Sequence, residues 1–487
     1  MNRSILLSLL LSAPAAAQLA PAAATSAKAV QRLNRAPVSK EILKVRLPRP
    51  TFATLPNGLT VMVVEQHKLP TVQMALWVTQ SGPVTEPGRL PGLAKFTADM
   101  LREGTKTRSS AQLALDVDEL GASLEASAAW GTDLSIVSAS GLVEDSGRLL
   151  ELMSDMATHP TFSAGELEKY KKRELAQLEE LRANPQFLGR ERFYAALYKE
   201  ASPARVAPTA EAIKSVTSED LKQYHADRYV PANSILGIAG DITLKEALPL
   251  VEKRFGGWTG KKAAAPALPA IPKAGGTRVL LVDRPGSVQT EIVAGNYSLV
   301  RTSPDYIPLT VANRVLGGGP SARLFLQLRE EKGYTYGAYS NFSADIYPGA
   351  FSARLAVRNE VTEPAMKDLL AELKKIRDEK VPADELDDSR RSIVAKFALS
   401  LESPGTLLNL WMSARYYGLP QDYWDRYTEE VALTSPDKVQ DAAKKYVDTD
   451  HLQIVCVGDA KKIQPLLTQF GPVEVYDVDG KRVEPAK

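Results

Sequence analysis

The sequence has few of the residues that crosslink a protein or hold a metal ion. Among its 487 residues there is one cysteine, Cys456, and there are four histidines. A single cysteine cannot form an internal disulfide, which excludes a secreted fold that depends on crosslinks. His67, His159, His225 and His451 are each isolated, with no second histidine at the short spacing of common zinc motifs. We therefore assign structural or surface roles to all four.

A strong net charge is also absent. Lys and Arg number 60 and Asp and Glu number 58, which gives a formal charge of +2. This balance carries no electrostatic signature of nucleic-acid binding. The 44% hydrophobic and 24% charged residues are ordinary for a soluble globular protein, and exclude a collagen, a polytopic membrane protein and a wholly disordered chain. At about three times the typical domain length, the chain is expected to hold at least two cores.

The N-terminus has the pattern of a secretory signal. Residues 1–17 contain Arg3, then an apolar run over residues 5–11, then three alanines. This predicts a cleaved signal peptide, too short for a permanent membrane anchor, and a periplasmic or secreted protein. No acidic residue precedes Glu41, so a mitochondrial transit peptide is the alternative, although the leucine-rich block favours secretion. Residues 18–47 are rich in Ala and Pro and are predicted to be a flexible leader.

Two stretches of the chain resemble each other at long range. TSEDLKQYHADRYVPANSILGIAGD begins at Thr217, and TSPDKVQDAAKKYVDTDHLQIVCVGD begins at Thr434, a period of 217 residues. Each predicts a capped helix followed by an apolar strand. Upstream, paired β-rich runs beginning at Leu59 and Arg278 extend the match. The period is too long for a solenoid repeat and indicates duplication of a whole domain.

A segment without periodicity separates the two halves. Residues 257–276 are dense in Gly, Ala, Pro and Lys and are predicted to be a linker. We expect an N-terminal domain over 48–256 and a C-terminal domain over 277–480. Both contain strands, then long helices such as those predicted for 166–182 and 384–403, then strands. The predicted fold class is α+β, with an antiparallel sheet covered by helices in each half.

Two apolar segments are expected in the core. Cys456 lies in QIVCVG, which predicts a buried strand with a buried thiol. Residues 407–417, LLNLWMSARYY, form an apolar helical pattern expected to pack in a core or against another subunit.

The stretch LPGLAKFTADMLREGT, from Leu90, resembles the active helix of the pitrilysin/insulinase (inverzincin) family of zinc peptidases. In that family two histidines of a His-x-x-Glu-His motif bind zinc, and the glutamate is the general base for the metal-bound water. Lys95, Ala98 and Asp99 stand at the three positions here. Lysine offers no lone pair and repels a cation, alanine moves no proton, and one carboxylate does not make a tetrahedral site. We expect no metal and no cofactor in this chain.

The family's third zinc ligand is a glutamate on a later helix. Our alignment places Ala176 or Gln177 at that position, in the helix predicted for 166–182. Three glutamates lie within about a turn of it: Glu174, Glu179 and Glu180. We interpret them as members of a solvated helix face with ion pairs one turn apart.

The second half carries a different motif. From Leu316, LGGGPSARLFLQLREEKGYTYGAYS resembles the family's C-domain segment, with Arg329 and Tyr336 at its Arg and Tyr positions. The resemblance implies that these two side chains hydrogen-bond the scissile carbonyl at a zinc site held by another domain. We expect a helix capped by Ser321 and ended by Gly333.

Two alternatives remain open for this motif. Arg329 can simply complement the helix dipole while Tyr336 is half-buried packing. If the register differs, Tyr334 or Tyr339 takes the place of Tyr336, which we expect to begin the following strand.

Members of the family pair into a clamshell around a chamber for unfolded peptides, and some pairs join a zinc-bearing chain to a chain that has lost the metal. This sequence resembles the second kind. It predicts a non-catalytic, substrate-binding subunit of a heterodimeric zinc peptidase, with peptides as substrate, a zinc-bearing paralogue as partner and no nucleic acid. A non-proteolytic scaffold or peptide-binding protein is the alternative, and a self-sufficient peptidase with an unusual metal site is a third hypothesis.

Overall fold

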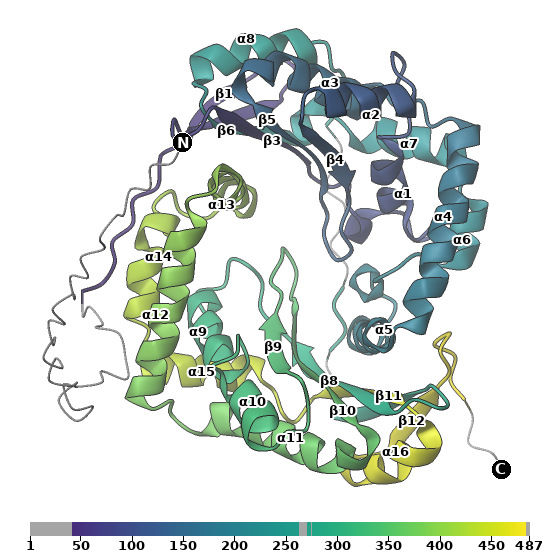
Figure 1. The fold of residues 1–487 in the computed structure, drawn as a ribbon, viewed down its shortest axis with the longest axis vertical. Helices are drawn as coiled ribbons and strands as arrows, with labels where there is room; N and C mark the ends of the chain where they lie inside the picture. Colours follow the sequence, from purple (N-terminus) through teal and green to yellow (C-terminus); the bar gives the residue numbers. More distant parts are fainter. Residues whose placement is uncertain (1–40, 263–269, 274, 484–487) are drawn as a thin grey trace, which may run out of the picture. The chain divides into compact units, whose positions relative to one another are not determined.

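A computed structural model describes residues 41–262, 270–273 and 275–483. The predicted signal peptide and most of the predicted leader lie outside the described residues. All helices and strands belong to one compact unit that begins at Leu43 (Figure 1). In the part of the chain that is described, no helix is both long and apolar enough to cross a membrane.

The first half contains a six-stranded sheet in the order β1-β2-β6-β3-β5-β4. Its strands are β1 (Thr51–Thr54), β2 (Thr60–Glu65), β3 (Thr71–Val78), β4 (Ser123–Ser127), β5 (Ser135–Leu142) and β6 (Ser234–Gly240). All neighbours are antiparallel except β2 and β6, which run parallel with Thr60 opposite Ile235.

The second half repeats this arrangement in the order β12-β7-β11-β8-β10-β9. Its strands are β7 (Arg278–Asp283), β8 (Gln289–Tyr297), β9 (Ala338–Phe342), β10 (Ala350–Arg358), β11 (Gln453–Gly458) and β12 (Val473–Tyr476). Here β7 pairs in parallel with both β11 and β12. The predicted α+β class with two duplicated sheets is confirmed, while the sheets are mixed because a strand that returns after a long helical crossover can pair in parallel.

Helices follow the strands in the same sequence in both halves. Those of the first half are α1 (Leu93–Met100), α2 (Ser110–Glu119), α3 (Ser146–Thr158), α4 (Ala164–Ala183), α5 (Pro185–Tyr198), α6 (Ala210–Ser215), α7 (Ser218–Arg228) and α8 (Leu244–Phe255), with short 3-10 turns η1 (Pro83–Thr85), η2 (Val143–Asp145), η3 (Ser202–Ala204) and η4 (Pro231–Asn233). Those of the second half are α9 (Tyr306–Leu316), α10 (Arg323–Phe325), α11 (Thr362–Asp378), α12 (Ala383–Ser400), α13 (Pro404–Tyr417), α14 (Tyr423–Ala432), α15 (Pro436–Tyr446) and α16 (Ala460–Leu467), with the π-helical segment η5 (Leu326–Glu331) and the 3-10 turns η6 (Asn359–Val361) and η7 (Thr468–Phe470). The repeat seen in the sequence is the pair of units α7–β6 and α15–β11.

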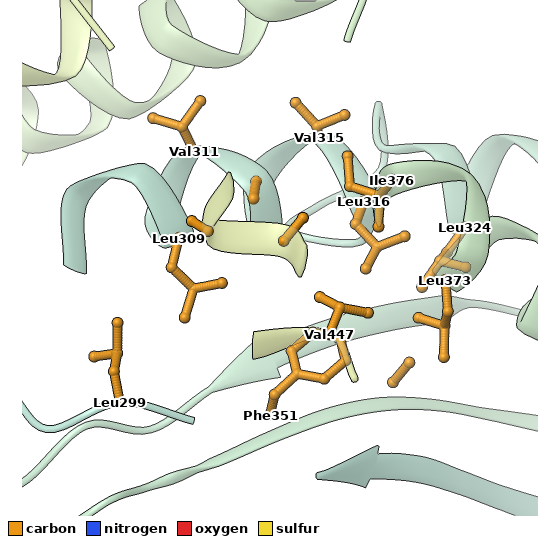
Figure 2. Close-up of a cluster of buried hydrophobic side chains, with 14 of the residues drawn as sticks. Leu299, Leu309, Val311, Val315, Leu316, Leu324, Phe351, Leu373, Ile376 and Val447 are labelled. Carbon is orange, nitrogen blue, oxygen red and sulfur yellow. The ribbon is translucent and has the colours of Figure 1, made fainter. Parts of the chain in front are cut away.

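One face of each sheet is covered by helices of its own half. In the second half, Leu309 and Leu316 of α9 and Leu373 and Ile376 of α11 lie over Phe351 of β10 (Figure 2). All five are at most 1% exposed, so this layer is a dry core. Cys456 is also fully buried, as predicted.

The other face of each sheet receives one helix from the opposite half. Helix α13 packs on β3 and β6 of the first sheet, and α5 packs on β7, β8 and β11 of the second (Figure 1). The approach of α13 depends on Gly237 in β6, because a Cβ there would lie 2.6 Å from Met412 Sδ and 2.7 Å from Leu408 Cδ1. This exchange of helices merges part of the first sheet with the core of the second half.

Between the halves, α8 ends at Phe255 and β7 begins at Arg278. Among the described residues of 257–276 there is neither helix nor strand. The domain limits 48–256 and 277–480 stay predictions. One buried core consists of residues 55–258 alone, whereas the core of the second half also includes residues of the first sheet.

Candidate functional site

The first motif lies on α1, whose N-terminus is fixed by a buried carboxylate. Glu86 accepts hydrogen bonds from the backbone N–H groups of Gly92 (2.8 Å) and Ala94 (3.0 Å). Burial raises the pKa of Glu86 to about 7, although these hydrogen bonds and Arg205 act in the opposite direction. Gly92 has φ of 98°, a conformation that favours glycine, so the chain turns tightly into the helix. The position of α1 is therefore set by groups outside it.

A lysine ammonium occupies the centre of the first motif. Lys95 Nζ forms an ion pair with Asp99, one turn further along α1, and lies 3.3 Å from Glu174 Oε1 on α4. Tyr170, also on α4, donates its hydroxyl hydrogen to Asp99 Oδ2 at 2.7 Å. Burial opposes the charge on Lys95, but the two carboxylates outweigh it and raise the pKa of Lys95 above its ordinary value. The lysine thus remains a cation held between carboxylates.

The contact with Glu174 corrects the alignment of the third ligand position. Glu174 faces Lys95 and is 7% exposed, whereas Ala176 and Gln177 lie on the exposed side of α4. The interpretation of Glu174 as part of a solvated face is also wrong. The sequence did carry a signal, because Leu167, Tyr170, Glu174 and Leu178 follow the helical spacing of a buried stripe.

These residues do not fit a zinc ion. Lys95 has no lone pair to donate, and its ammonium supplies the positive charge that Asp99 and Glu174 attract. Ala98, where the family places its general base, is fully buried in the first core. Within residues 41–262, 270–273 and 275–483, no group of three or more His, Cys, Asp or Glu residues could hold a metal ion.

The histidines make structural contacts. His225 is buried with its Nε2 2.8 Å from the carbonyl oxygen of Ala157, and burial lowers the pKa of His225 to about 4. His67 Nδ1 lies 2.6 Å from Asp241 Oδ1 at the surface. Hydrogen bonds that the imidazole donates to Asp241 and Glu65 raise the pKa of His67.

The second motif forms a short, irregular helix. Helix α10 begins after Ala322 and continues directly into the π-helical η5. The prediction that Ser321 caps this helix is wrong, because Ser321 Oγ accepts a hydrogen bond from Arg314 Nη2 at 2.9 Å instead. Gly333 follows the helix with φ of 62°, as its predicted role as the terminator requires.

Arg329 and Tyr336 both project from this segment. The Arg329 guanidinium lies over the Phe325 ring, 4.7 Å from its centroid, and its Nη1 pairs with Glu330 at 2.9 Å. Tyr336 is 90% exposed, so the alternative of half-buried packing is wrong. It precedes β9, which begins at Ala338, and does not start the strand as expected.

The two alternative tyrosines have other environments. Tyr334 packs against the second core, and Tyr339 is 36% exposed on β9. The two motifs lie on different halves of the chain, and in the described residues no hydrogen bond or ion pair joins Lys95 or Asp99 to Arg329 or Tyr336.

Comparisons with known proteins agree with this organisation. Residues 60–208 match the family described as Insulinase (Peptidase family M16), and residues 215–393 match the Peptidase M16 inactive domain. The uncharacterized zinc protease YmxG of Bacillus subtilis is 27% identical over 73% of this chain and 85% of its own length. An uncharacterized zinc protease of Mycobacterium leprae is 25% identical over 74% of this chain and 80% of its own length.

Two solved structures share the fold. A peptidase M16 inactive domain from Pseudomonas fluorescens superposes with a TM-score of 0.79 at 25% identity, over 84% of this chain and 98% of that one. A protease from Helicobacter pylori superposes with a TM-score of 0.78 at 20% identity, over 84% of this chain and all of that one.

Proposed function

Because the chain belongs to peptidase family M16, the insulinase family, we propose that it is the non-catalytic, substrate-binding subunit of a two-chain zinc peptidase. The substrates are peptides or unfolded proteins, and a zinc-bearing paralogue is the partner. The observation that carries this proposal is the exposure of the Arg329 and Tyr336 side chains, at 43% and 90%. Donors that serve a site on another polypeptide must project from their own surface.

The first motif supports a non-catalytic role for the chain by itself. Lys95 lies between Asp99 and Glu174, and its ammonium and a metal ion would compete for the same carboxylates. Ala98 offers no group to accept a proton from water. We therefore expect the purified chain to carry no stoichiometric zinc, and the pair to depend on the partner's metal.

The chemistry assigned to the second motif is transition-state stabilisation. When water adds to a peptide carbonyl, negative charge develops on the oxygen, and the guanidinium N–H groups of Arg329 and the hydroxyl of Tyr336 can donate hydrogen bonds to it. One such donor typically contributes about a hundredfold or more in rate. Glu330 is the present partner of Arg329, and it would exchange this contact for the substrate.

The predicted signal peptide supports a periplasmic or secreted setting for this activity. Arg3, the apolar run and the three alanines support export across the membrane. The unbroken leucine-rich block also favours a secretory signal over the mitochondrial alternative. Fractionation of cells that express the full-length chain tests this assignment.

Reconstitution tests the proposed function. The mature chain is mixed with a paralogue that retains His-x-x-Glu-His, and cleavage of an unfolded peptide is followed by its kcat and KM. Arg329→Ala is expected to lower kcat by about a hundredfold with little change in KM, because the donor acts mainly in the transition state. The matched control is Arg358→Ala, which removes an exposed arginine at the end of β10 in the same half.

Two results would contradict the proposal. The first is full activity of the paralogue without this chain, which would favour the non-proteolytic scaffold. The second is unchanged kcat for Arg329→Ala in a mixture that depends on the chain, since a merely structural subunit needs no donor at this position.

A further inference from the structure

The second sheet has a face that is only partly covered. Helix α5 packs there on β7, β8 and β11, and it leaves the neighbouring β10 and β9 open to a cavity of about 640 Å³. The cross-strand register places Arg354 of β10 directly opposite Val293 of β8 and Tyr339 of β9. Since residues directly opposite in a sheet share one face, these side chains line the same wall.

Two arginines line this cavity without forming an ion pair among the described residues. Arg190 lies on α5 and Arg354 lies on β10, so they come from opposite walls. Both are exposed, and within the described residues neither guanidinium forms an ion pair or hydrogen bond. The one acidic residue that lines this cavity is Glu291 of β8. The lining is therefore electropositive, and unpaired guanidinium groups are suited to bidentate binding of a carboxylate.

Glu291 is an unusual residue in this position. It is 5% exposed, and its carboxyl group has no hydrogen bond or ion pair within the described part of the chain. A buried carboxyl without a partner is costly, and such a group is often satisfied by a ligand or held neutral. This side chain also lines a second cavity, of about 580 Å³, together with Asn184 and Gln186, which line both. The two cavities therefore adjoin at these three residues, and we refer to them together as the groove.

We propose that this groove binds a carboxylate of the peptide substrate, held between Arg190 and Arg354, so that the subunit selects acidic peptides. This inference rests on the proposed function, since it names the class of substrate for a peptide-binding subunit.

The state of Glu291 is compatible with an anionic ligand. Burial raises its pKa to about 7, against the opposing effect of Arg354. Near neutral pH a large fraction of this carboxyl group is therefore protonated, and it can donate a hydrogen bond to an incoming carboxylate. A basic peptide side chain would instead meet two unpaired arginines. The charge balance of the cavity therefore favours a peptide with an acidic side chain over one with a basic side chain.

Binding to the isolated mature chain tests the proposal without any partner. The probes are unstructured fluorescent peptides of equal length with an amidated C-terminus and a central Glu or Gln, followed by anisotropy. The Glu peptide is expected to bind about tenfold more tightly, a ratio that one charge-assisted hydrogen bond typically provides. Arg190→Gln and Arg354→Gln should each reduce this ratio toward one, while the control Arg358→Gln, on the same strand as Arg354 but outside the cavity, should preserve it.

A third probe identifies the source of the carboxylate. The Gln peptide with a free C-terminus will gain the same tenfold if the groove takes a terminal carboxylate. This gain without a Glu preference would overturn the selection of acidic peptides, whereas a Glu preference that depends on both arginines supports it. Equal binding of all three peptides, or a Glu preference that survives both substitutions, would overturn it.

The outcome is separable from that of the proposed function. A chain that lacks the Glu preference but still needs Arg329 in the reconstituted pair refutes only the acidic selectivity. A chain that prefers the Glu peptide but never activates a paralogue refutes only the peptidase role.

Discussion

Removal of the Lys95 ammonium should destabilise the first half of the protein. In Lys95→Met, Glu174 and Asp99 lose the cation between them while keeping their own charges. Two unit charges 3.3 Å apart attract by about 5 kcal/mol at an effective dielectric constant of ~20. Lys95 and Glu174 are 23% and 9% exposed, so solvent screens part of this energy. We expect a loss of about 2–3 kcal/mol in the free energy of unfolding, below the ~3–5 kcal/mol for breaking a fully buried pair.

A double-mutant cycle separates the ion pair from packing. The free energy of urea unfolding is measured for Lys95→Met, Glu174→Gln and the double variant. The double variant should be more stable than the sum of the single losses predicts, by about 1 kcal/mol or more, because neither charge is then left unpaired. The exposed pair of Lys169 and Glu166 on α4 is the control, and Lys169→Met should cost at most ~0.5 kcal/mol. A coupling energy near zero between Lys95 and Glu174 would show that the ammonium does not act as an internal cation.

Three further predictions follow from the site and the core. Restoring His, Glu and His at the three motif positions of α1 should produce stoichiometric zinc binding, measured by metal analysis, because Glu174 already lies beside the site. The same variant with Glu174→Gln should bind zinc more weakly, and equal affinity would contradict the assignment of Glu174 to the third ligand position. Gly237→Val should lower stability by ~1–3 kcal/mol in urea unfolding, since its Cβ would lie 2.6 Å from a sulfur of α13, while Gly257→Ala, with nothing within 4 Å of its Cβ, should be nearly neutral. Burial raises the pKa of Glu291 from 4.5 to about 7, so the contribution of this group to stability is fully present below pH ~4.5 and is lost as the pH rises through about 7. The Glu291→Gln variant should therefore be more stable than the natural protein at pH 8, by up to ~3 kcal/mol, with little difference near pH 4. A difference in stability that does not depend on pH would contradict this cause.

The first motif shows how far a sequence pattern reaches. The i,i+4 spacing on α1 was sufficient to place Lys95 and Asp99 on one helix face, and the structure pairs them. The alignment failed at Glu174, because a single offset of two or three residues on α4 changes which side of the helix faces α1. The apolar spacing along α4 does identify Glu174, since a glutamate among buried apolar positions requires a partner.

The local geometry of the second motif differs from the prediction. The sequence favoured a regular helix capped by Ser321, whereas the chain forms α10 and a π-helical segment with Ala322 before it. Arg314 of α9 donates a hydrogen bond to the Ser321 hydroxyl, and this competing contact is visible only in three dimensions. The exposure of Tyr336 likewise depends on what the rest of the fold leaves uncovered.

The groove of the second sheet could not have been predicted at all. Arg190, Glu291 and Arg354 are far apart in the sequence and belong to no motif. They meet because α5 of the first half crosses to the second sheet, in exchange for α13. An apolar helical pattern such as that of 407–417 specifies burial, but it does not specify which sheet provides the partner surface.

The amino-acid sequence by itself determined the duplication, the α+β class and the presence of Lys95, Ala98 and Asp99 at the positions of the zinc motif, because each is encoded by local spacing or by similarity between segments. Only the tertiary structure decided that Glu174 pairs with Lys95, that the halves exchange helices, and that two unpaired arginines face a buried carboxyl group. The physical reason is that charges and packing surfaces interact through distance in space, and that distance is fixed only when the whole chain has folded.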